Sequence, residues 1–387
     1  MRTKAPVIGA VEIGTATIKI IVGTHKGRQL SILSHAECPS RGVSKGTVID
    51  FAAASECTHQ ALQAAEHRAG VSVDYVFLAQ TGDHLAGCLN EATVNVQAGS
   101  QRVAKSDIAA VCALATAKEL PPDRMVLHHL RGPFRVDGRV VPGNPVRHVG
   151  RRLEVGCWIM HGQQCKLAES IHLLRGSGCA VRELVFAGLA SGEVVTTTPE
   201  RQRGILVLDL GAGTTDYVLY REGRPCITGV LPVGGVHLTY DLALGLRLTE
   251  AQAEKLKLRH GRALVSTRHR DKKVWLAGNY TIGDRQVSRQ AIEQITSART
   301  REIFEVVKMK LGPDFRPETC AAGVILTGGM SRLRGIVTCA TGVFGVPARR
   351  GKPPRSVQGG KLRGPGYSTV LGLLRFHHGA NHLNNSE

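Results

Sequence analysis

A chain of 387 residues is too long for one typical hydrophobic core, so two or more domains are expected. Its content of 42% hydrophobic and 21% charged residues excludes a disordered chain, and no unbroken apolar run reaches the roughly 20 residues that cross a bilayer. The net charge of +19 favours an anionic partner: lipid, acidic protein or nucleic acid. The basic clusters lack the interleaved aromatic residues that stack bases, so no nucleic acid is expected, and a solvated basic surface is the simplest interpretation.

Cysteine and histidine do not indicate a metal site. The ten cysteines are scattered without the short paired spacing of a zinc site, which predicts reduced thiols in the cytosol. The adjacent pairs His128-His129 and His377-His378 have no further ligand at metal-binding spacing, so we expect no metal held by the protein alone. The opening sequence leads into a strand without a signal-peptide pattern, and a cytoplasmic location is expected.

Residues 1–82 are predicted to fold as β-β-β-α-β. Two apolar runs within residues 7–23 flank a turn that contains glycine and hydroxyl side chains, and a short run at 30–34 extends the sheet. Apolar positions at helical spacing predict a helix over 50–69, and the run at 74–80 predicts a buried strand.

Residues 83–162 change the pattern and are predicted to form an inserted subdomain. They combine alternating polar strands with one helix at 105–118 and a stretch at 130–152 that is rich in proline, glycine and arginine. Residues 163–202 then alternate helix, strand and helix, and end in a hydrophilic linker at 196–203.

Residues 203–236 repeat the device that opens the chain. The run GILVLDLGAGTTDYVLY again places an acidic, glycine-rich turn between two β-runs, which predicts two similar lobes that face each other. Residues 237–319 are charged and mostly helical, as in a second insertion, and residues 320–387 return to a strand that ends in TGGMS before a helix. The prediction is an α/β fold of two lobes with two inserted subdomains.

The first glycine-rich turn carries residue types that bind a polyphosphate. Gly14 lets the backbone approach a ligand, Thr15 and Thr17 offer hydroxyl groups, and Lys19 offers a cation. Glu12 is expected to hold a metal-bound water. A glycine-threonine hairpin alone is a weak signal, because most such turns only join strands.

The second turn is more specific. Flexible residues and hydroxyl groups between two acids expose backbone N–H groups to phosphate while a carboxylate faces Mg²⁺. Asp209 is the expected Mg²⁺-associated residue, and Asp216 is interpreted as a cap of the hairpin. The expected phosphate-binding residues are Gly211, Gly213, Thr214 and Thr215.

A third turn and a charged helix are assigned to the nucleoside. LTGGMS closes a buried strand with bare backbone on which a ring or ribose can lie, and it contributes Gly328, Gly329 and Met330. Glu254 and Lys257 share one helical face three residues apart and are expected to reach adenosine. A dinucleotide fold is disfavoured because a strand follows the second turn, and no Walker sequence occurs.

The ordered turns resemble those of the actin, sugar-kinase and heat-shock chaperone ATPase superfamily. Within it the chain resembles the FtsA family of bacterial actin-like cell-division proteins over nearly its whole length. The motifs that carry this resemblance are VEIGTATIKIIVG, CPSRGVSKGTVID, ELVFAGLASGE, GILVLDLGAGTTDYVLY, LPVGGVHLTYDLALGL, AEKLKLRHG and GVILTGGMSRLRG.

The resemblance implies a two-lobed actin-like ATPase fold that binds ATP and Mg²⁺ and assembles head to tail. Its FtsA-type insertion, subdomain 1C, carries filament contacts and meets other division proteins. The surface at Arg299, Arg301 and Glu302 resembles the one that takes the acidic C-terminal tail of FtsZ. The implied subdomains are 1A at 1–82 and 163–202, 1C at 83–162, 2A at 203–236 and 320–387, and 2B at 237–319.

Two departures from the family pattern change the expectations. The position that orients the attacking water in hydrolysing relatives is Ala187 here, so hydrolysis is expected to be slow or absent, with Glu193 as a substitute candidate. The tail HHGANHLNNSE lacks an amphipathic membrane helix, so contact with the inner face of the membrane is expected only through the basic surface or another protein. The alternatives are a PilM-like pilus-assembly scaffold and a small-molecule kinase.

Overall fold

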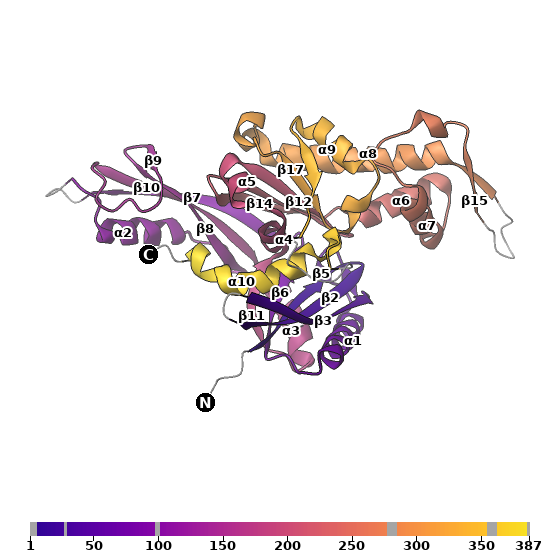
Figure 1. The fold of residues 1–387 in the computed structure, drawn as a ribbon, viewed down its shortest axis with the longest axis horizontal. Helices are drawn as coiled ribbons and strands as arrows, with labels where there is room; N and C mark the ends of the chain where they lie inside the picture. Colours follow the sequence, from indigo (N-terminus) through magenta and orange to yellow (C-terminus); the bar gives the residue numbers. More distant parts are fainter. Residues whose placement is uncertain (1–5, 27–28, 97–100, 277–284, 354–361, 385–387) are drawn as a thin grey trace.

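Lobe I is built on one five-stranded sheet whose strands come mainly from the apolar runs near the start of the chain (Figure 1). The computed structural model describes residues 6–26, 29–96, 101–276, 285–353 and 362–384. In sheet order the strands of lobe I are β11 (Val181–Phe186), β6 (Tyr75–Gln80), β1 (Val7–Ile13), β2 (Thr17–Lys26) and β3 (Gln29–Pro39). The predicted short third run is a long strand, because it pairs with β2 along its whole length.

Lobe II repeats this topology. Its strands, in sheet order, are β14 (Arg224–Leu231), β13 (Thr215–Arg221), β12 (Ile205–Leu210), β17 (Val324–Thr327) and β18 (Ala348–Arg350). In each lobe the central strand, β1 or β12, pairs antiparallel with the next strand and parallel with a later one. The predicted repeat of one β-turn-β device is therefore confirmed.

Helices cover the outer faces of the two sheets. In lobe I, α1 (Phe51–Ala69) and α3 (Gln164–Gly176) pack on buried residues of the sheet. The Asp50 side chain caps α1 by accepting the N–H of Ala53, and Gly70 ends the helix in the left-handed conformation. In lobe II, α8 (Arg289–Leu311) and α9 (Ile336–Phe344) cover the corresponding face.

Two helices fill the space between the lobes. α4 (Ala187–Val195) contacts α10 (Ser368–Asn384), and both belong to a core that also includes residues of β1, β6, β12 and β13. Gly372 lies directly against the backbone carbonyl of Ala190, so the two helices cross with no side chain between them at this point. The lobes are therefore joined by a continuous apolar core.

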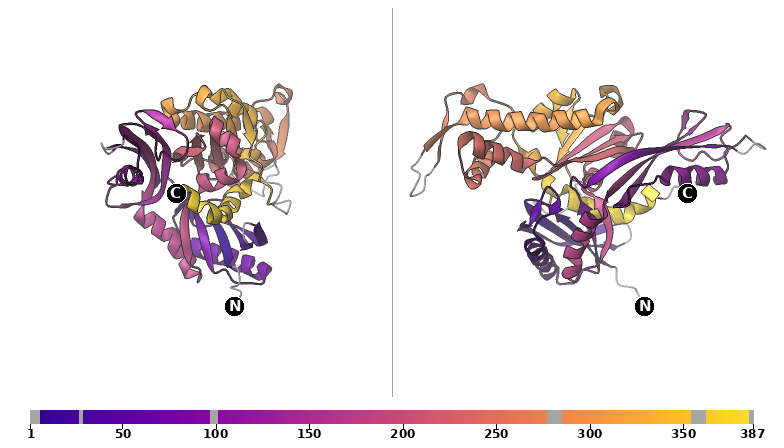
Figure 2. Two further views of the ribbon diagram at one scale, coloured as in Figure 1. Left: turned by 60° about the vertical axis from the view of Figure 1, so that its left-hand side comes forward. Right: turned by 180° about the vertical axis from the view of Figure 1, so that it is seen from behind.

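The first insertion projects from the side of the molecule (Figures 1 and 2). Its sheet contains β7 (Leu85–Asn95), β10 (Arg152–Gln163), β8 (Arg124–Val136) and β9 (Arg139–Val141), and α2 (Lys105–Thr116) covers one face. About half of the stretch rich in proline, glycine and arginine is strand, and β8 pairs with β10 through two register shifts.

The base of this insertion also contacts lobe II. The Trp158 indole Nε1 donates a hydrogen bond of 2.9 Å to Thr228 Oγ1 on β14. The Arg224 guanidinium donates to the backbone carbonyls of Arg131 and Gly132 at 3.4 and 3.3 Å. The inserted subdomain thus continues the chain of lobe I and is hydrogen-bonded to the edge strand of lobe II.

The second insertion lies at the opposite end of the molecule (Figures 1 and 2). It contains α6 (Gly235–Leu246), α7 (Glu250–His260), the first part of α8 and a hairpin of β15 (Lys273–Leu276) and β16 (Arg285–Ser288). The hairpin was not expected, because its strands have only four residues each in a segment rich in helix formers.

Three other segments differ from the sequence predictions. The supposed linker forms α5 (Thr198–Arg203), because the Glu200 side chain accepts the N–H of Thr197 in a capping box. A small hairpin of β4 (Val43–Ser44) and β5 (Thr47–Val48) precedes α1 and was not predicted. After β17 the chain forms only a 3₁₀ turn, η4 (Gly329–Arg332), and the α-helix begins later.

Cysteines and metal-ligating residues are dispersed in the structure. All ten cysteines are free thiols. The His, Cys, Asp and Glu side chains of the described ranges nowhere gather as a metal-binding group. His128 is buried and accepts the backbone N–H of Phe186 at 3.0 Å, whereas the side chains of His377 and His378 lie outside the described residues. Among the helices described, none combines the length and apolar character needed to cross a membrane.

The close crossing of α4 and α10 gives a stability prediction. We expect Gly372→Ala to lower the free energy of unfolding by about 1–3 kcal/mol, because the added methyl group meets a backbone carbonyl that cannot rotate away. Gly342→Ala in α9 is the matched control: its methyl group would enter open space, so it should leave stability unchanged or raise it slightly. Thermal unfolding of both variants measures the difference, and equal melting temperatures would contradict the packing argument.

Candidate functional site

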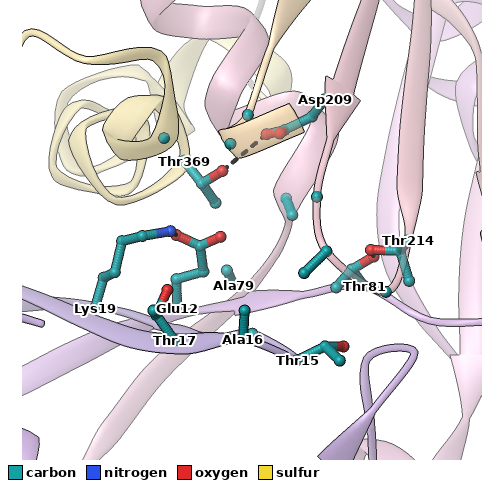
Figure 3. A pocket seen from close by; sticks show the side chains of 18 of the residues that line it. Glu12, Thr15, Ala16, Thr17, Lys19, Ala79, Thr81, Asp209, Thr214 and Thr369 are labelled. Carbon is teal, nitrogen blue, oxygen red and sulfur yellow. Dashed lines mark hydrogen bonds and ion pairs between the residues drawn. The ribbon is translucent and has the colours of Figure 1, made fainter. Parts of the chain in front are cut away.

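A cavity of about 310 Å³ lies where the glycine-rich turns of the two lobes meet (Figure 3). Its walls come from the β1–β2 turn, the β12–β13 turn, the end of β6, the start of α4, and the segments that precede α9 and α10. The predicted residues that line it are Glu12, Gly14, Thr15, Thr17, Lys19, Asp209, Gly211, Gly213, Thr214, Gly328 and Gly329.

The turn between β1 and β2 is tight and carries an ion pair. The N–H of Gly14 donates to the carbonyl of Thr17 at 3.1 Å, and a Cβ at Gly14 would lie only 2.9 Å from that oxygen. Lys19 and Glu12 are direct partners in the β1–β2 register, and Lys19 Nζ lies 3.1 Å from Glu12 Oε2 (Figure 3). The Lys19 cation is therefore neutralised by the carboxylate of Glu12 on the neighbouring strand.

The turn between β12 and β13 faces the first turn across the cavity. The N–H of Gly211 donates to the carbonyl of Thr214 at 2.9 Å, and Gly213 lies directly against the Thr15 hydroxyl group of lobe I. Thr215, which was predicted to bind phosphate, is fully buried and does not line the cavity; its hydroxyl donates to the Val233 carbonyl at 2.8 Å. In this arrangement Thr215 fixes the turn.

Asp209 lies at the cavity wall, at the end of β12. The Thr369 hydroxyl donates to Asp209 Oδ2 at 2.9 Å (Figure 3), and Gly328, with a φ of +80°, packs against the same carboxylate. Burial, and next the nearby Glu12 carboxylate, raises the pKa of Asp209 to about 6. A buried carboxylate without a cation is costly, so the position favours an incoming divalent ion.

Asp216 has a larger role than the hairpin cap predicted for it. It lines the cavity, and the Thr81 hydroxyl, at the end of β6, donates to Asp216 Oδ1 at 2.5 Å and lies 3.2 Å from Thr214 Oγ1. Burial, and next the charge of Asp209, holds the pKa of Asp216 well above its ordinary value. This contact joins the two lobes at the floor of the cavity.

The residues assigned to adenosine divide into two groups. Gly328 and Gly329 line the cavity, whereas Glu254, Lys257 and Met330 do not. Glu254 and Lys257 do share a helical face, with 2.7 Å between Lys257 Nζ and Glu254 Oε2. Lys257 also donates to the Gly235 carbonyl at 2.9 Å, so this pair lies at the start of α6, beside the second turn.

Several lining residues were not found from the sequence. Tyr367 donates to Glu37 Oε2 at 2.8 Å across the outer end of the cavity, and Thr369, Thr81 and Arg332 contribute further polar groups. Thr369 lies in the first turn of a helix that follows a Pro-Gly pair, which is a recognisable signal. Glu37 and Thr81 only reach the cavity through strand pairing, which no local pattern reveals.

The hydrolysis-related residues take different positions. Ala187 lines the cavity at the first residue of α4. The substitute candidate Glu193 does not line the cavity. Its carboxylate instead forms an ion pair of 2.8 Å with Arg201 of α5. The suggestion that Glu193 positions water is therefore wrong, because Glu193 lies about 1.7 helical turns beyond Ala187, which is at the cavity end of α4.

The cavity fits a nucleoside phosphate with a divalent cation. Gly14, Gly211 and Gly328 each approach neighbouring backbone so closely that a side chain would displace it, which leaves bare backbone toward the cavity. Hydroxyl groups from both lobes and the carboxylates of Glu12 and Asp209 supply hydrogen-bond partners and hard oxygen ligands.

The three residues of the predicted partner surface on α8 do not all lie on one face of the helix. Arg299 binds Asp241 of α6 in a two-point contact of 2.6 and 2.9 Å, and Arg299 Nη1 lies 2.7 Å from Glu302. Arg301 is exposed and, being two residues away, does not share the face of Arg299. Beside the Arg299 contact, α6 exposes the apolar side chains of Tyr240 and Leu244.

Comparisons with known proteins match nearly the whole chain. The family model described as Cell division protein FtsA matches residues 206–372, and the model for the SHS2 domain inserted in FTSA matches 82–161. The cell division protein FtsA of Neisseria meningitidis is 31% identical over 95% of this chain and 89% of its own length; that of Escherichia coli K12 is 31% identical over 99% and 92%.

Among solved structures, the PilM-PilN type IV pilus biogenesis complex aligns with a TM-score of 0.61 at 22% identity, over 95% of this chain and 97% of that one. MreB5 of Spiroplasma citri bound to ADP aligns with a TM-score of 0.57 at 13% identity, over 98% and 99%. These likenesses show the fold alone, and the predicted actin-like ATPase fold is confirmed.

The raised pKa of Asp209 predicts a pH-dependent stability. Between about pH 4 and 6 the unfolded chain loses this proton first, so the free energy of unfolding should fall by up to about 3 kcal/mol as pH rises through that window. Asp209→Asn cannot ionise, so its gain in melting temperature over the wild type should be larger at pH 7.5 than at pH 4, without nucleotide or Mg²⁺. Asp271→Asn, at an exposed site, is the control; parallel pH profiles for Asp209→Asn and wild type would contradict the assignment.

Proposed function

Because this chain belongs to the FtsA family of cell-division proteins, we propose that it is an ATP-binding, actin-like scaffold of the division site. It assembles head to tail, recruits FtsZ through subdomain 2B and meets other division proteins through subdomain 1C. The observation that carries the nucleotide part is the cavity in which two glycine-rich turns face each other beside Glu12, Lys19 and Asp209.

In this proposal the two turns hold the phosphates and the carboxylates hold Mg²⁺. The backbone at Gly14, Gly211 and Gly213 and the nearby hydroxyl groups bind phosphate oxygens, and Lys19 turns from Glu12 to the phosphates. Glu12 and Asp209 are then free to hold the cation through water. ATP supplies the negative charge that draws both lobes onto one ligand. When ATP closes the cleft between the lobes, the closed form favours head-to-tail assembly.

Hydrolysis is proposed to be slow or absent. Ala187 offers no carboxylate or amide at the position where α4 meets the cavity. Asp216 accepts a hydrogen bond from Thr81 at the cavity floor, so neither side chain is proposed to orient an attacking water. The nucleotide therefore acts as a ligand that holds a conformation, and the kinase alternative is disfavoured because it needs turnover.

The FtsZ tail is proposed to bind along the α6 and α8 face of subdomain 2B. An acidic peptide needs cations that are not already neutralised, and the exposed Arg301 has no ion-pair partner among the described residues. The exposed Tyr240 and Leu244 offer apolar area beside the Arg299–Asp241 contact. Arg299 is proposed to hold α6 against α8, so that both parts of the surface keep their places.

A nucleotide-binding experiment tests the first part. Asp209→Ala should abolish binding of ATP in the presence of Mg²⁺, as measured by isothermal titration calorimetry, because it removes the buried carboxylate proposed to hold the cation. Asp271→Ala removes an exposed carboxylate and should bind as the wild type does. Unchanged affinity of Asp209→Ala would refute the assignment.

A peptide-binding experiment tests the second part and separates it from the PilM-like alternative. Arg301→Glu should weaken binding of an FtsZ C-terminal tail peptide about fivefold at low salt, measured by fluorescence anisotropy, because it replaces attraction with repulsion. Lys105→Glu, the same charge reversal on subdomain 1C, should have no effect. Binding of a PilN-type peptide, with none of the FtsZ peptide, would favour the pilus-assembly function.

A further inference from the structure

The hairpin β4–β5 lies at the wall of the cavity and has no role in the function proposed so far. It belongs to lobe I, and its turn, Lys45-Gly46, points toward lobe II. The motif CPSRGVSKGTVID, in which it lies, was assigned no chemistry from the sequence. Gly46 lines the cavity, so the turn forms part of the nucleotide site itself.

The turn contacts both sides of the cleft. A Cβ at Gly46 would overlap the carbonyl oxygen of Thr81, and the Thr81 hydroxyl bonds to Asp216 of lobe II at 2.5 Å. A Cβ at Gly213, in the second phosphate turn, would lie 3.0 Å from the backbone N and Cα of Lys45. The hairpin thus packs against the phosphate turn of the opposite lobe.

Lysine is an unfavourable residue at its place in this turn. Lys45 and Gly46 both have positive φ angles, +50° and +77°, as in the two-residue type I′ hairpin turn, where Asn or Asp normally precedes glycine. The turn at Asp137-Gly138, with φ angles of +49° and +79°, has the favoured residue. The Asp137 carboxylate also accepts the backbone N–H groups of Arg151 and Arg152. Among the described residues Lys45 has no such compensating bond, so the choice of lysine here calls for another explanation.

The charges around the cavity supply that explanation. Four carboxylates line it, those of Glu12, Glu37, Asp209 and Asp216, against two cationic side chains, Lys19 and Arg332. Lys19 is paired with Glu12, so a nucleoside triphosphate would meet more negative than positive charge. The exposed Lys45 side chain has no hydrogen-bond or ion-pair partner among the described residues, and its backbone lies beside Gly213 of the second glycine-rich turn. Its charge also contributes, after burial, to the lowered pKa of His237 in the first turn of α6.

We propose that Lys45 is a specificity-determining residue that binds the terminal phosphate of a nucleoside triphosphate and thereby holds the hairpin against the opposite lobe. A diphosphate lacks this terminal group, so in this proposal the hairpin distinguishes ATP from ADP. This inference rests on the proposed nucleotide site and adds to it the group that reads the third phosphate. The chemistry required is one charge-assisted contact between an ammonium group and a phosphate oxygen.

Lys45→Asn is the sharpest test, because asparagine suits the turn and removes only the cation. We expect it to weaken binding of the ATP analogue AMPPNP with Mg²⁺ about tenfold in calorimetry and to leave ADP binding within about twofold. The melting temperature of the nucleotide-free chain should stay unchanged or rise slightly, because asparagine suits the positive φ. Lys45→Arg should retain most of the preference for the triphosphate. Lys105→Asn, at an exposed lysine of the first insertion, should bind both nucleotides as the wild type does.

Amide hydrogen exchange supplies a second readout that does not depend on affinity. In the wild type, AMPPNP should protect residues 43–48 more than ADP does, and Lys45→Asn at saturating nucleotide should remove the difference. Two results together would overturn the role of Lys45 but leave the nucleotide site standing. Lys45→Asn would lose the same affinity for both nucleotides, or none, and AMPPNP and ADP would protect residues 43–48 equally in the wild type. A wild-type chain that binds neither nucleotide would overturn the proposed nucleotide site and this inference with it.

Discussion

The contact between Gly213 and Thr15 is the constraint on which the architecture of the cleft depends. A methyl group at Gly213 would overlap the threonine hydroxyl, so the two glycine-rich turns touch across the lobes with only backbone on the Gly213 side. This proximity brings the ends of two separate sheets to one cavity and places the charges of both lobes within it. The same contact brings the Lys45 backbone against the second turn, so the hairpin and both turns form one connected wall.

Buried negative charge is the energetic consequence of that architecture. Burial raises the pKa of both Asp209 and Asp216, followed by the charge of Glu12 for Asp209 and the charge of Asp209 for Asp216. Hydrogen bonds from Thr369 and Thr81 offset part of this cost of ionisation. The charge of Lys19 is neutralised by its ion pair with Glu12. A cavity with this balance is poised for a ligand that brings a divalent cation together with its own anionic groups, and it stores destabilisation that such a ligand would relieve.

Sequence patterns predicted the lobes well because each depends on local signals. The turn at Gly14 and the turn at Gly211 both lie between apolar runs, and the strand pairing of β1 with β2 and β12 with β13 follows from them. The positions of Glu37, Thr81 and Tyr367 depend on pairings between segments far apart in the chain, which leave no local pattern. The β4–β5 hairpin was overlooked because its strands have two residues each, too few for any periodicity. Thr215 and Glu193 had suitable chemistry, but strand alternation and helix phase turn them away from the cavity.

The bond between Trp158 and Thr228 gives the inserted subdomain a mechanical property. Its polypeptide enters and leaves through lobe I, while its base is fastened to the outermost strand of lobe II. Any hinge motion of one lobe against the other must therefore either break these hydrogen bonds or rotate the subdomain as a rigid body. Because the subdomain extends well beyond the body of the molecule (Figure 2), a slight rotation at its base becomes a long sweep at its tip. Under the proposed function, closure of the cleft would therefore displace the tip of the inserted subdomain, far from the ligand that causes it.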